Sequence, residues 1–207
     1  MRFYDVDSGD ILLDGKSIYD FDLKYLRQHF AIVQQEPQLF NETISYNIQY
    51  NLKNITQEDI ENAVKISHAY DFIMQEDFGG FQKKVGSKGS LISGGQKQRI
   101  AISRAVLRNS SVFLFDEATS ALDSNVESMV QKQLEEYMIG KTAIIIAHRI
   151  STIKNCKIIY VFDKGQVIEQ GDYNYLVSQK GHFYHLEQGL LNQDLELSFQ
   201  QEDINHA

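Results

Sequence analysis

The chain has 207 residues, which suits one domain or a large part of one, and 43% of them are hydrophobic, enough to bury a core. Its net charge of -8 disfavours a nucleic-acid-binding protein, because such proteins usually present a basic face. No apolar run approaches the roughly 18–20 residues that cross a bilayer, and the single cysteine, Cys156, excludes an internal disulfide.

The N-terminal segment predicts a short strand and a tight turn. Residues 11–13 are apolar, and the Asp14-Gly15 pair that follows favours a hairpin turn. Gly15-Lys16-Ser17 ends like the phosphate-binding loop G-x-x-x-x-G-K-[ST], but Asp10 stands where the first glycine is required. Residues 140–142, Gly-Lys-Thr, fail in the same way because Glu135 holds that position. The sequence therefore contains no such loop.

Three short apolar runs predict strands that are buried on both faces of a parallel sheet: residues 30–33, 112–115 and 143–147. Polar side chains follow each run, namely Gln34-Gln35, Asp116-Glu117 and His148. In open α/β sheets, ligands bind beyond the carboxyl ends of the strands. We therefore expect these side chains to meet in one crevice, although polar residues can also simply end a strand.

Helices are predicted between these strands, which favours an α/β fold. Thr56 and Asp59 mark one helix start, and Ser124 with Glu127 predicts a capping box for another helix that stops at Gly140. A further helix is expected over residues 94–107. Residues 41–108 contain no long strand and are predicted to form a mostly helical insertion.

The Ser93-Gly94-Gly95-Gln96 turn predicts an anion site. Serine is a good N-cap, glycine lets a phosphate approach the backbone, and the start of a helix presents N–H groups and a positive dipole. The alternative is a glycine-rich cap without a ligand. The continuation Lys97-Gln98-Arg99-Ile100-Ala101 makes the functional interpretation more specific.

Asp116 and Glu117 predict phosphoryl-transfer chemistry. A carboxylate at a strand end can hold Mg²⁺, and its neighbour can polarise an attacking water molecule. Gln35 is a candidate neutral ligand of the metal or the water, and His148 a candidate contact of a γ-phosphate. For each of these residues considered alone, the alternative is an ordinary structural or solvent-exposed side chain without a catalytic role.

Taken together, these motifs resemble the nucleotide-binding domain of an ATP-binding cassette (ABC) exporter of the multidrug-resistance, or P-glycoprotein-like, type. The resemblance extends over about Arg2 to Leu190. Its motifs are a Q-loop (Val33–Phe40), a signature (Ser93–Gln96), a Walker B strand with a D-loop (Phe115–Asp123) and an H-loop (Ala147–Thr152).

The resemblance implies a P-loop-type (RecA-like) α/β core sheet with a helical subdomain, whose N-terminal strands and phosphate loop are missing. The implied divisions are 1–40 (core remnant and Q-loop), 41–108 (helical subdomain and signature), 109–190 (core with Walker B, D-loop and H-loop) and 191–207 (polar tail).

The resemblance also implies ATP and Mg²⁺ as ligands and a role for each motif. Asp116 and Gln35 would hold Mg²⁺, Glu117 would be the catalytic base, and His148 would sense the γ-phosphate. Two such domains dimerise head to tail, so the signature residues would serve the partner's nucleotide; these residues are Ser93, Gly94, Gly95 and Gln96. The D-loop residues Ser120, Ala121 and Asp123 would lie at the dimer seam.

Further implied features are a transmembrane-domain partner, which would contact Pro37–Ile48, and a place on the cytosolic face of a membrane, with no nucleic acid bound. The chain departs from the family pattern at Ile92, where leucine is usual, and in lacking the Walker A loop. We therefore expect the chain alone to be inactive. A short non-catalytic cassette partner or a pseudogene product is the alternative. A soluble cassette acting on DNA or ribosomes is disfavoured by the exporter-like Gln35–Phe40 segment and the acidic charge.

Overall fold

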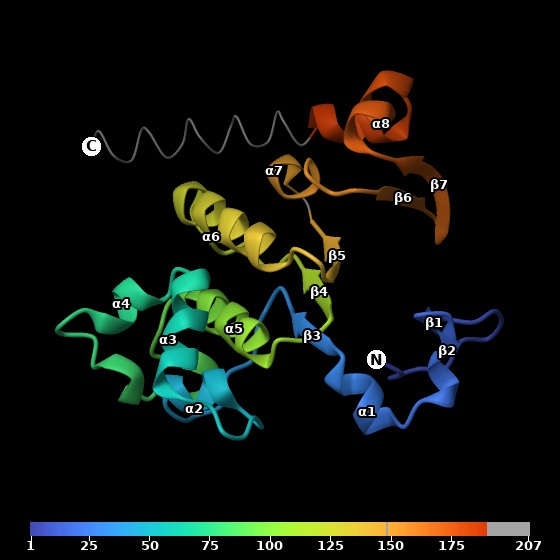
Figure 1. Ribbon diagram of the computed structural model, residues 1–207. Coiled ribbons are helices and arrows are strands. Elements are labelled where there is room, and N and C mark those ends of the chain that lie inside the picture. The colour runs from blue at the N-terminus through green and yellow to red at the C-terminus, as the bar shows by residue number, and fades with distance from the viewer. Residues whose placement is uncertain (148, 190–207) are drawn as a thin grey trace, which may run out of the picture. The chain divides into compact units, whose positions relative to one another are not determined.

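The computed structural model describes residues 1–147 and 149–189 (Figure 1). The chain divides into two compact units, Met1–Ile145 and Ile146–Ala207. The predicted four-part division of the sequence stays a prediction, and its polar tail, residues 191–207, lies outside the described residues.

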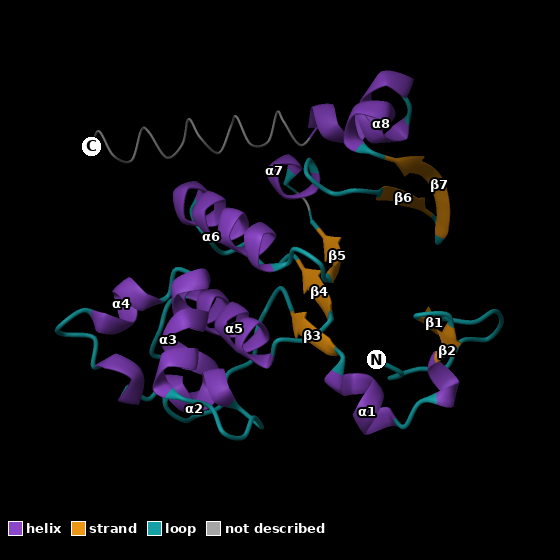
Figure 2. Ribbon diagram, in the orientation of Figure 1, coloured by secondary structure: helices purple, strands orange, loops and turns teal. Residues whose placement is uncertain are grey.

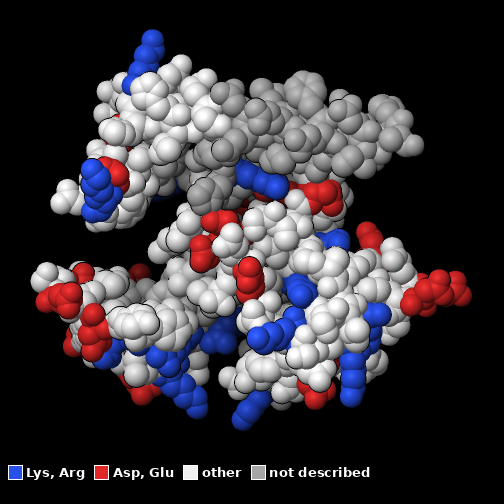
Figure 3. All heavy atoms as spheres, turned by 180° about the vertical axis from the view of Figure 1, so that it is seen from behind, with Lys and Arg blue, Asp and Glu red and all other residues white. Residues whose placement is uncertain are grey.

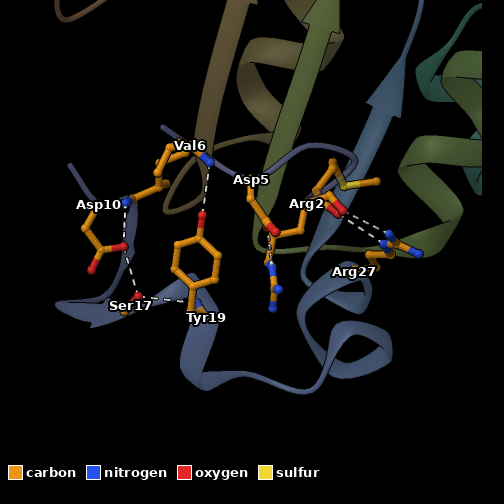
Figure 4. Close-up of polar contacts among 9 residues, drawn as sticks. Arg2, Asp5, Val6, Asp10, Ser17, Tyr19 and Arg27 are labelled. Carbon is orange, nitrogen blue, oxygen red and sulfur yellow. Dashed lines mark hydrogen bonds and ion pairs between the residues drawn. The ribbon is translucent and has the colours of Figure 1, made fainter. Parts of the chain in front are cut away.

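The first unit begins with the predicted hairpin. Strands β1 (Leu12–Leu13) and β2 (Lys16–Ser17) pair antiparallel. The turn residues Asp14 and Gly15 have φ values of 50° and 78°, the left-handed backbone that such a turn requires. Ser17 Oγ donates a hydrogen bond of 2.9 Å to Asp10 Oδ1 (Figure 4). The predicted strand and tight turn of this segment are confirmed.

The residues before the hairpin are tied to the two helices that follow it, η1 (Ile18–Asp20) and α1 (Leu23–Gln28). Arg27 of α1 donates hydrogen bonds to the carbonyl oxygens of Met1 (3.1 Å) and Arg2 (3.3 Å) (Figure 4). The hydroxyl of Tyr19 accepts a hydrogen bond of 3.0 Å from the backbone N–H of Val6. These contacts hold an otherwise exposed segment against the fold.

The central sheet has the order β3-β4-β5 (Figure 2). Strand β3 (Phe30–Val33) runs parallel to β4 (Val112–Asp116), and Val33 lies opposite Phe115. Strand β5 covers Thr142–Ile146. All three apolar runs therefore form strands, as predicted.

The prediction that all three strands are buried on both faces is wrong for β5, and also for one face of β3, where Ile32 is 43% exposed. Phe113 of β4 is fully buried, whereas Ile144 of β5 is 56% exposed. Ile145, which points to the opposite face, packs against the first unit's main core. Since successive side chains of a strand alternate between faces, β5 is covered on one face only within the described structure.

The helical insertion between β3 and β4 is confirmed. It contains α2 (Ile44–Gln49), α3 (Gln57–Ile66), α4 (Tyr70–Met74), η2 (Gly80–Gln82), η3 (Ser87–Gly89) and α5 (Gly94–Arg108). These helices enclose their own apolar cluster. The predicted start of α3 is also confirmed, since Thr56 and Asp59 form a capping box.

Helix α6 (Ser124–Tyr137) starts differently from the prediction. Its N-cap is Asp123, whose Oδ1 accepts a hydrogen bond of 3.0 Å from the backbone N–H of Val126. Ser124 is therefore already inside the helix. Glu127 is buried and accepts a hydrogen bond of 2.9 Å from Thr119 Oγ1, so it is no partner in a capping box with Ser124. Asp123 is as well suited to capping as Ser124, and in the structure Asp123 occupies the N-cap position.

The second unit contains α7 (Ile150–Ile153), the antiparallel pair β6 (Ile159–Asp163) and β7 (Gln166–Gly171), α8 (Tyr173–Gln179) and helical residues 182–189. A small core joins them, formed by Val161, Leu176 and Phe183.

Glu169 of β7 fixes the start of the last helix. Its carboxylate accepts hydrogen bonds from the backbone N–H groups of His182 (2.6 Å) and Phe183 (2.8 Å). These bonds, with that to Phe183 the largest contribution, lower the pKa of Glu169 below its ordinary value. A Cβ atom at Gly181 would lie 2.2 Å from Glu169 Oε1, so a side chain at that position would require the carboxylate to move.

None of the described helices is long and apolar enough to cross a membrane.

Lysine and arginine side chains are interspersed with acidic ones over the face seen in Figure 3.

Candidate functional site

The carboxyl ends of β3 and β4 bring two predicted site residues together. Gln35 Nε2 donates a hydrogen bond of 2.8 Å to Glu117 Oε2, across a separation of 82 residues in the sequence. Asp116, the last residue of β4, is exposed to solvent and immediately precedes Glu117 in the sequence. The expectation that strand ends deliver a glutamine and a glutamate to one place is therefore met.

The backbone at Glu117 turns sharply. Its φ of 48° is left-handed, which is unusual for a residue with a side chain. Its carbonyl oxygen accepts a hydrogen bond of 3.1 Å from Ser120 N–H, which closes a turn directly after the strand. Backbone strain of this kind is concentrated at functional sites.

The signature residues form the predicted helix start. Ser93 is the N-cap of α5, and it exchanges hydrogen bonds with Gln96 in a capping box that also uses the Gln96 side chain. The prediction that Ser93 caps this helix is confirmed.

Gly95 lets the start of α5 approach the D-loop closely. A Cβ atom at Gly95 would lie 3.1 Å from the carbonyl oxygen of Ala121, whereas one at Gly94 would make an ordinary contact of 3.6 Å with Ala121 Cβ. The signature and the D-loop of this chain are therefore packed against each other.

Gln98 is a residue of the site for which the sequence alone predicted no role. It is 1% exposed, and its side-chain amide joins the loop after β3, at Gln35, to the loop after β4, at Glu117 and Ala121. A signal was available, because Gln98 lies three, four and seven positions before Ala101, Ile102 and Ala105, on the apolar face of the helix.

A second buried network ties the Q-loop to the helical region. Asn47 is fully buried and bonds both the N–H and the carbonyl oxygen of Phe40 (2.8 and 3.0 Å). Arg104 of α5 donates to the Asn47 carbonyl oxygen (2.7 Å), to Asn47 Oδ1 (3.0 Å) and to the Gln38 carbonyl oxygen (3.2 Å). Burial lowers the pKa of the Arg104 guanidinium from its ordinary value.

The residues at the strand ends suit Mg²⁺ held partly by phosphates and water. Among the described residues there is no group of three or more His, Cys, Asp or Glu side chains that could form an all-protein metal cage. Mg²⁺ typically takes only one or two carboxylates and completes its shell with water and phosphate oxygens. Asp116, exposed at the end of β4, is the carboxylate available for such a site. Because Gln35 Nε2 donates to Glu117, its Oε1 is the atom suited to a metal.

The remaining predicted site residues have these places. Ser120 and Ala121 lie in the loop after β4, and Asp123 caps α6. His148 lies outside the described residues.

An α/β sheet with a paired glutamine and glutamate at its strand ends, and a glycine-rich helix start packed on the next loop, resembles a nucleotide-binding domain. A family model described as "ABC transporter" matches residues 1–120. The chain belongs to the ABC transporter family, whose members generally use ATP to drive transport.

Curated relatives agree with this assignment. The chain is 46% identical to "ABC transporter B family member 4" of Dictyostelium discoideum over 93% of this chain and 25% of the relative. It is 46% identical to the "ATP-dependent lipid A-core flippase" of Methylobacillus flagellatus over 88% of this chain and 31% of the relative. The chain thus spans about a quarter to a third of the length of these relatives.

A solved structure, "Structure of a bacterial Atm1-family ABC exporter with ATP bound", matches with a TM-score of 0.86 and 37% identity. The match covers 94% of this chain and 33% of that one.

Proposed function

We propose that this chain is the ATP-hydrolysing domain of an ABC exporter, a membrane transporter driven by ATP. The observation that carries the proposal is the 2.8 Å hydrogen bond between Gln35 and Glu117 at the ends of adjacent parallel strands. The names of the relatives, an ATP-dependent flippase and an exporter with ATP bound, support the same activity.

Glu117 is the proposed catalytic base. Its side chain is only half-buried, so a water molecule can reach the carboxylate. The water would lose a proton to Glu117 while its oxygen bonds to the γ-phosphorus, and the bond from that phosphorus to the ADP oxygen would break, so that ADP and phosphate leave. Gln35 orients this carboxylate through its amide N–H. His148 is proposed to sense the γ-phosphate.

Asp116 is proposed to hold Mg²⁺ through water, with Gln35 Oε1 as a neutral ligand. When bound, Mg²⁺ would supply positive charge that offsets the charge on the phosphates.

A second cassette is the proposed partner at the face formed by the signature and the D-loop. In a head-to-tail dimer, Ser93–Gln96 would bind the partner's nucleotide at the positive end of α5, while Ser120, Ala121 and Asp123 would line the seam. The close packing of Gly95 on Ala121 supports this arrangement, because it brings both motifs to one place.

The transmembrane domain of the transporter is the proposed partner of the Q-loop region, on the cytosolic side. Phe40 stacks on Tyr50 there, Tyr46 contacts both rings edge-on or at a tilt, and each of the three remains 42% exposed. An exposed aromatic cluster of this kind is typical of an interface.

We also propose that the 207 residues alone do not hydrolyse ATP, because their sequence contains no phosphate-binding loop. The alternative is a non-catalytic cassette that offers its signature to another subunit.

The test is the substitution Glu117→Gln in the complete protein encoded by this gene, assayed for ATP hydrolysis. Glutamine keeps the shape of the side chain but cannot accept the proton, so kcat should fall by about 10²–10⁴-fold while ATP binding is retained. Glu58→Gln, on an exposed position of α3, is the matched control and should leave kcat unchanged. Unchanged hydrolysis in Glu117→Gln would contradict the proposal.

A further inference from the structure

Gln98 is an amide in a position where packing alone would favour an apolar side chain. It is 1% exposed and lies on the face of α5 that also carries the buried Ala101, Ile102 and Ala105. Burying an amide is unfavourable unless its donors and acceptor are paired. The hydrogen-bond partners of Gln98 therefore indicate why an amide occupies this position.

The Gln98 amide contacts the Q-loop, the residue after the Walker B strand, and the D-loop. Its Nε2 donates to the carbonyl oxygens of Gln35 (3.2 Å) and Glu117 (3.4 Å) and to Ser120 Oγ (3.3 Å). Its Oε1 accepts from the backbone N–H of Ala121 at 2.9 Å. Oxygen atoms around the nitrogen and an N–H group beside the oxygen define the orientation of the amide.

These contacts restrain both members of the Gln35–Glu117 pair. Glu117 is held in a left-handed conformation, φ 48°, and Gln98 binds its carbonyl oxygen. Gln35, which binds the Glu117 carboxylate, has its own carbonyl oxygen bound by the same amide. The buried Gln98 side chain thus holds the backbone of Glu117, which carries the candidate catalytic carboxylate, and the backbone of Gln35, which binds that carboxylate.

We propose that Gln98 is a positioning residue for ATP hydrolysis: it holds the backbones of Gln35 and Glu117 so that the Glu117 carboxylate stays aimed at the attacking water. The proposal rests on the proposed function. The competing explanation is that Gln98 merely contributes to the stability of α5.

The experiment measures kcat and KM for ATP in the complete protein with Gln98→Met, which fills the same space without these hydrogen bonds. Because small misplacements of a catalytic group have large effects, kcat should fall roughly 10- to 100-fold while KM changes less than about threefold. Ser103→Ala is the matched control, since Ser103 is also buried on α5 and bonds Ser67 (2.7 Å) and the Arg99 carbonyl (2.8 Å), away from the site. It should lower the melting temperature without lowering kcat.

Gln98→Glu gives a second readout that a purely structural role would not produce. An ionised glutamate offers only acceptors to the carbonyl oxygens of Gln35 and Glu117, whereas a protonated glutamate can donate to them. The ratio of variant to wild-type kcat should therefore rise as the pH is lowered. A ratio that does not change with pH, or a Gln98→Met protein with wild-type kcat, would overturn the proposal while ATP hydrolysis itself stands. A wild-type protein without ATP hydrolysis would instead refute the proposed function, and with it this role.

Discussion

The two compact units of the chain are held by different kinds of polar contact. In residues 1–145, the buried Gln98 and the partly buried Arg104 of α5 bind backbone atoms of distant segments. In the second unit, the partly exposed carboxylate of Glu169 binds the start of a helix beside a small core. An amide has no charge to lose and a guanidinium keeps its proton, whereas a carboxylate can be protonated. The first unit should therefore be costly to disrupt at any moderate pH, and the second should weaken in acid.

The largest expected effect comes from Arg104→Ala. The change leaves the Asn47 and Gln38 carbonyl oxygens without their charged donor. Because hydrogen bonds to charged groups stabilise a fold more than neutral ones, the free energy of the opening reaction that exposes backbone amides to exchange should fall by about 3 kcal/mol. Hydrogen exchange of the complete protein should show the loss in α2 and α5 but not in residues 159–189. Arg104→Lys should restore part of it. Equal exchange in wild type and Arg104→Ala would contradict the importance of this network.

A smaller effect is expected from closing the space at Gly95. Gly94→Ala and Gly95→Ala should gain similar helix propensity, but only the second places Cβ within 3.1 Å of the Ala121 carbonyl oxygen. Gly95→Ala should therefore be less stable than Gly94→Ala by about 1 kcal/mol in denaturant unfolding. If the two variants unfold alike, the D-loop is less tightly held than the contacts indicate.

The smallest effect is expected from Glu169→Gln, and it depends on pH. The folded-state pKa of Glu169 is lowered, so its stabilisation is fully present above the ordinary value of 4.5 and is lost as the pH falls through the folded value. At pH 7 the variant should be less stable by about 0.5 kcal/mol, since solvent screens an exposed charge at a helix start. Melting curves should converge as the pH approaches the lowered value. The Arg104→Lys difference should show no such convergence.

The sequence predicted local features of the first unit well. The three apolar runs became β3, β4 and β5, and Ser93 and Thr56 cap their helices as expected. Such features depend on neighbouring residues and on the period of apolar positions, both of which can be read directly from the chain. Asp123 and Ser124 show the limit of this approach, because adjacent residues suited to capping compete and only the fold decides between them.

Contacts between distant residues could not be predicted in the same way. The Gln35–Glu117 pair was expected only as a meeting of strand ends, and its hydrogen bond became visible in the fold. Gln98 and Asn47 were missed because a buried polar residue is recognised by its partners, and those partners lie on other loops. The exposure of Ile144 was missed for a related reason, since an apolar run does not say whether both faces of a strand are covered.

Gly181 carries a consequence for how this sequence can vary among relatives. Any side chain there would meet the Glu169 carboxylate, which cannot move aside without releasing the His182 and Phe183 N–H groups. A larger residue at position 181 is therefore compatible only with a shorter one at position 169. The two positions should change together in an alignment, and Gly189, which has nothing within 4 Å of the place of a Cβ atom, should vary independently of both.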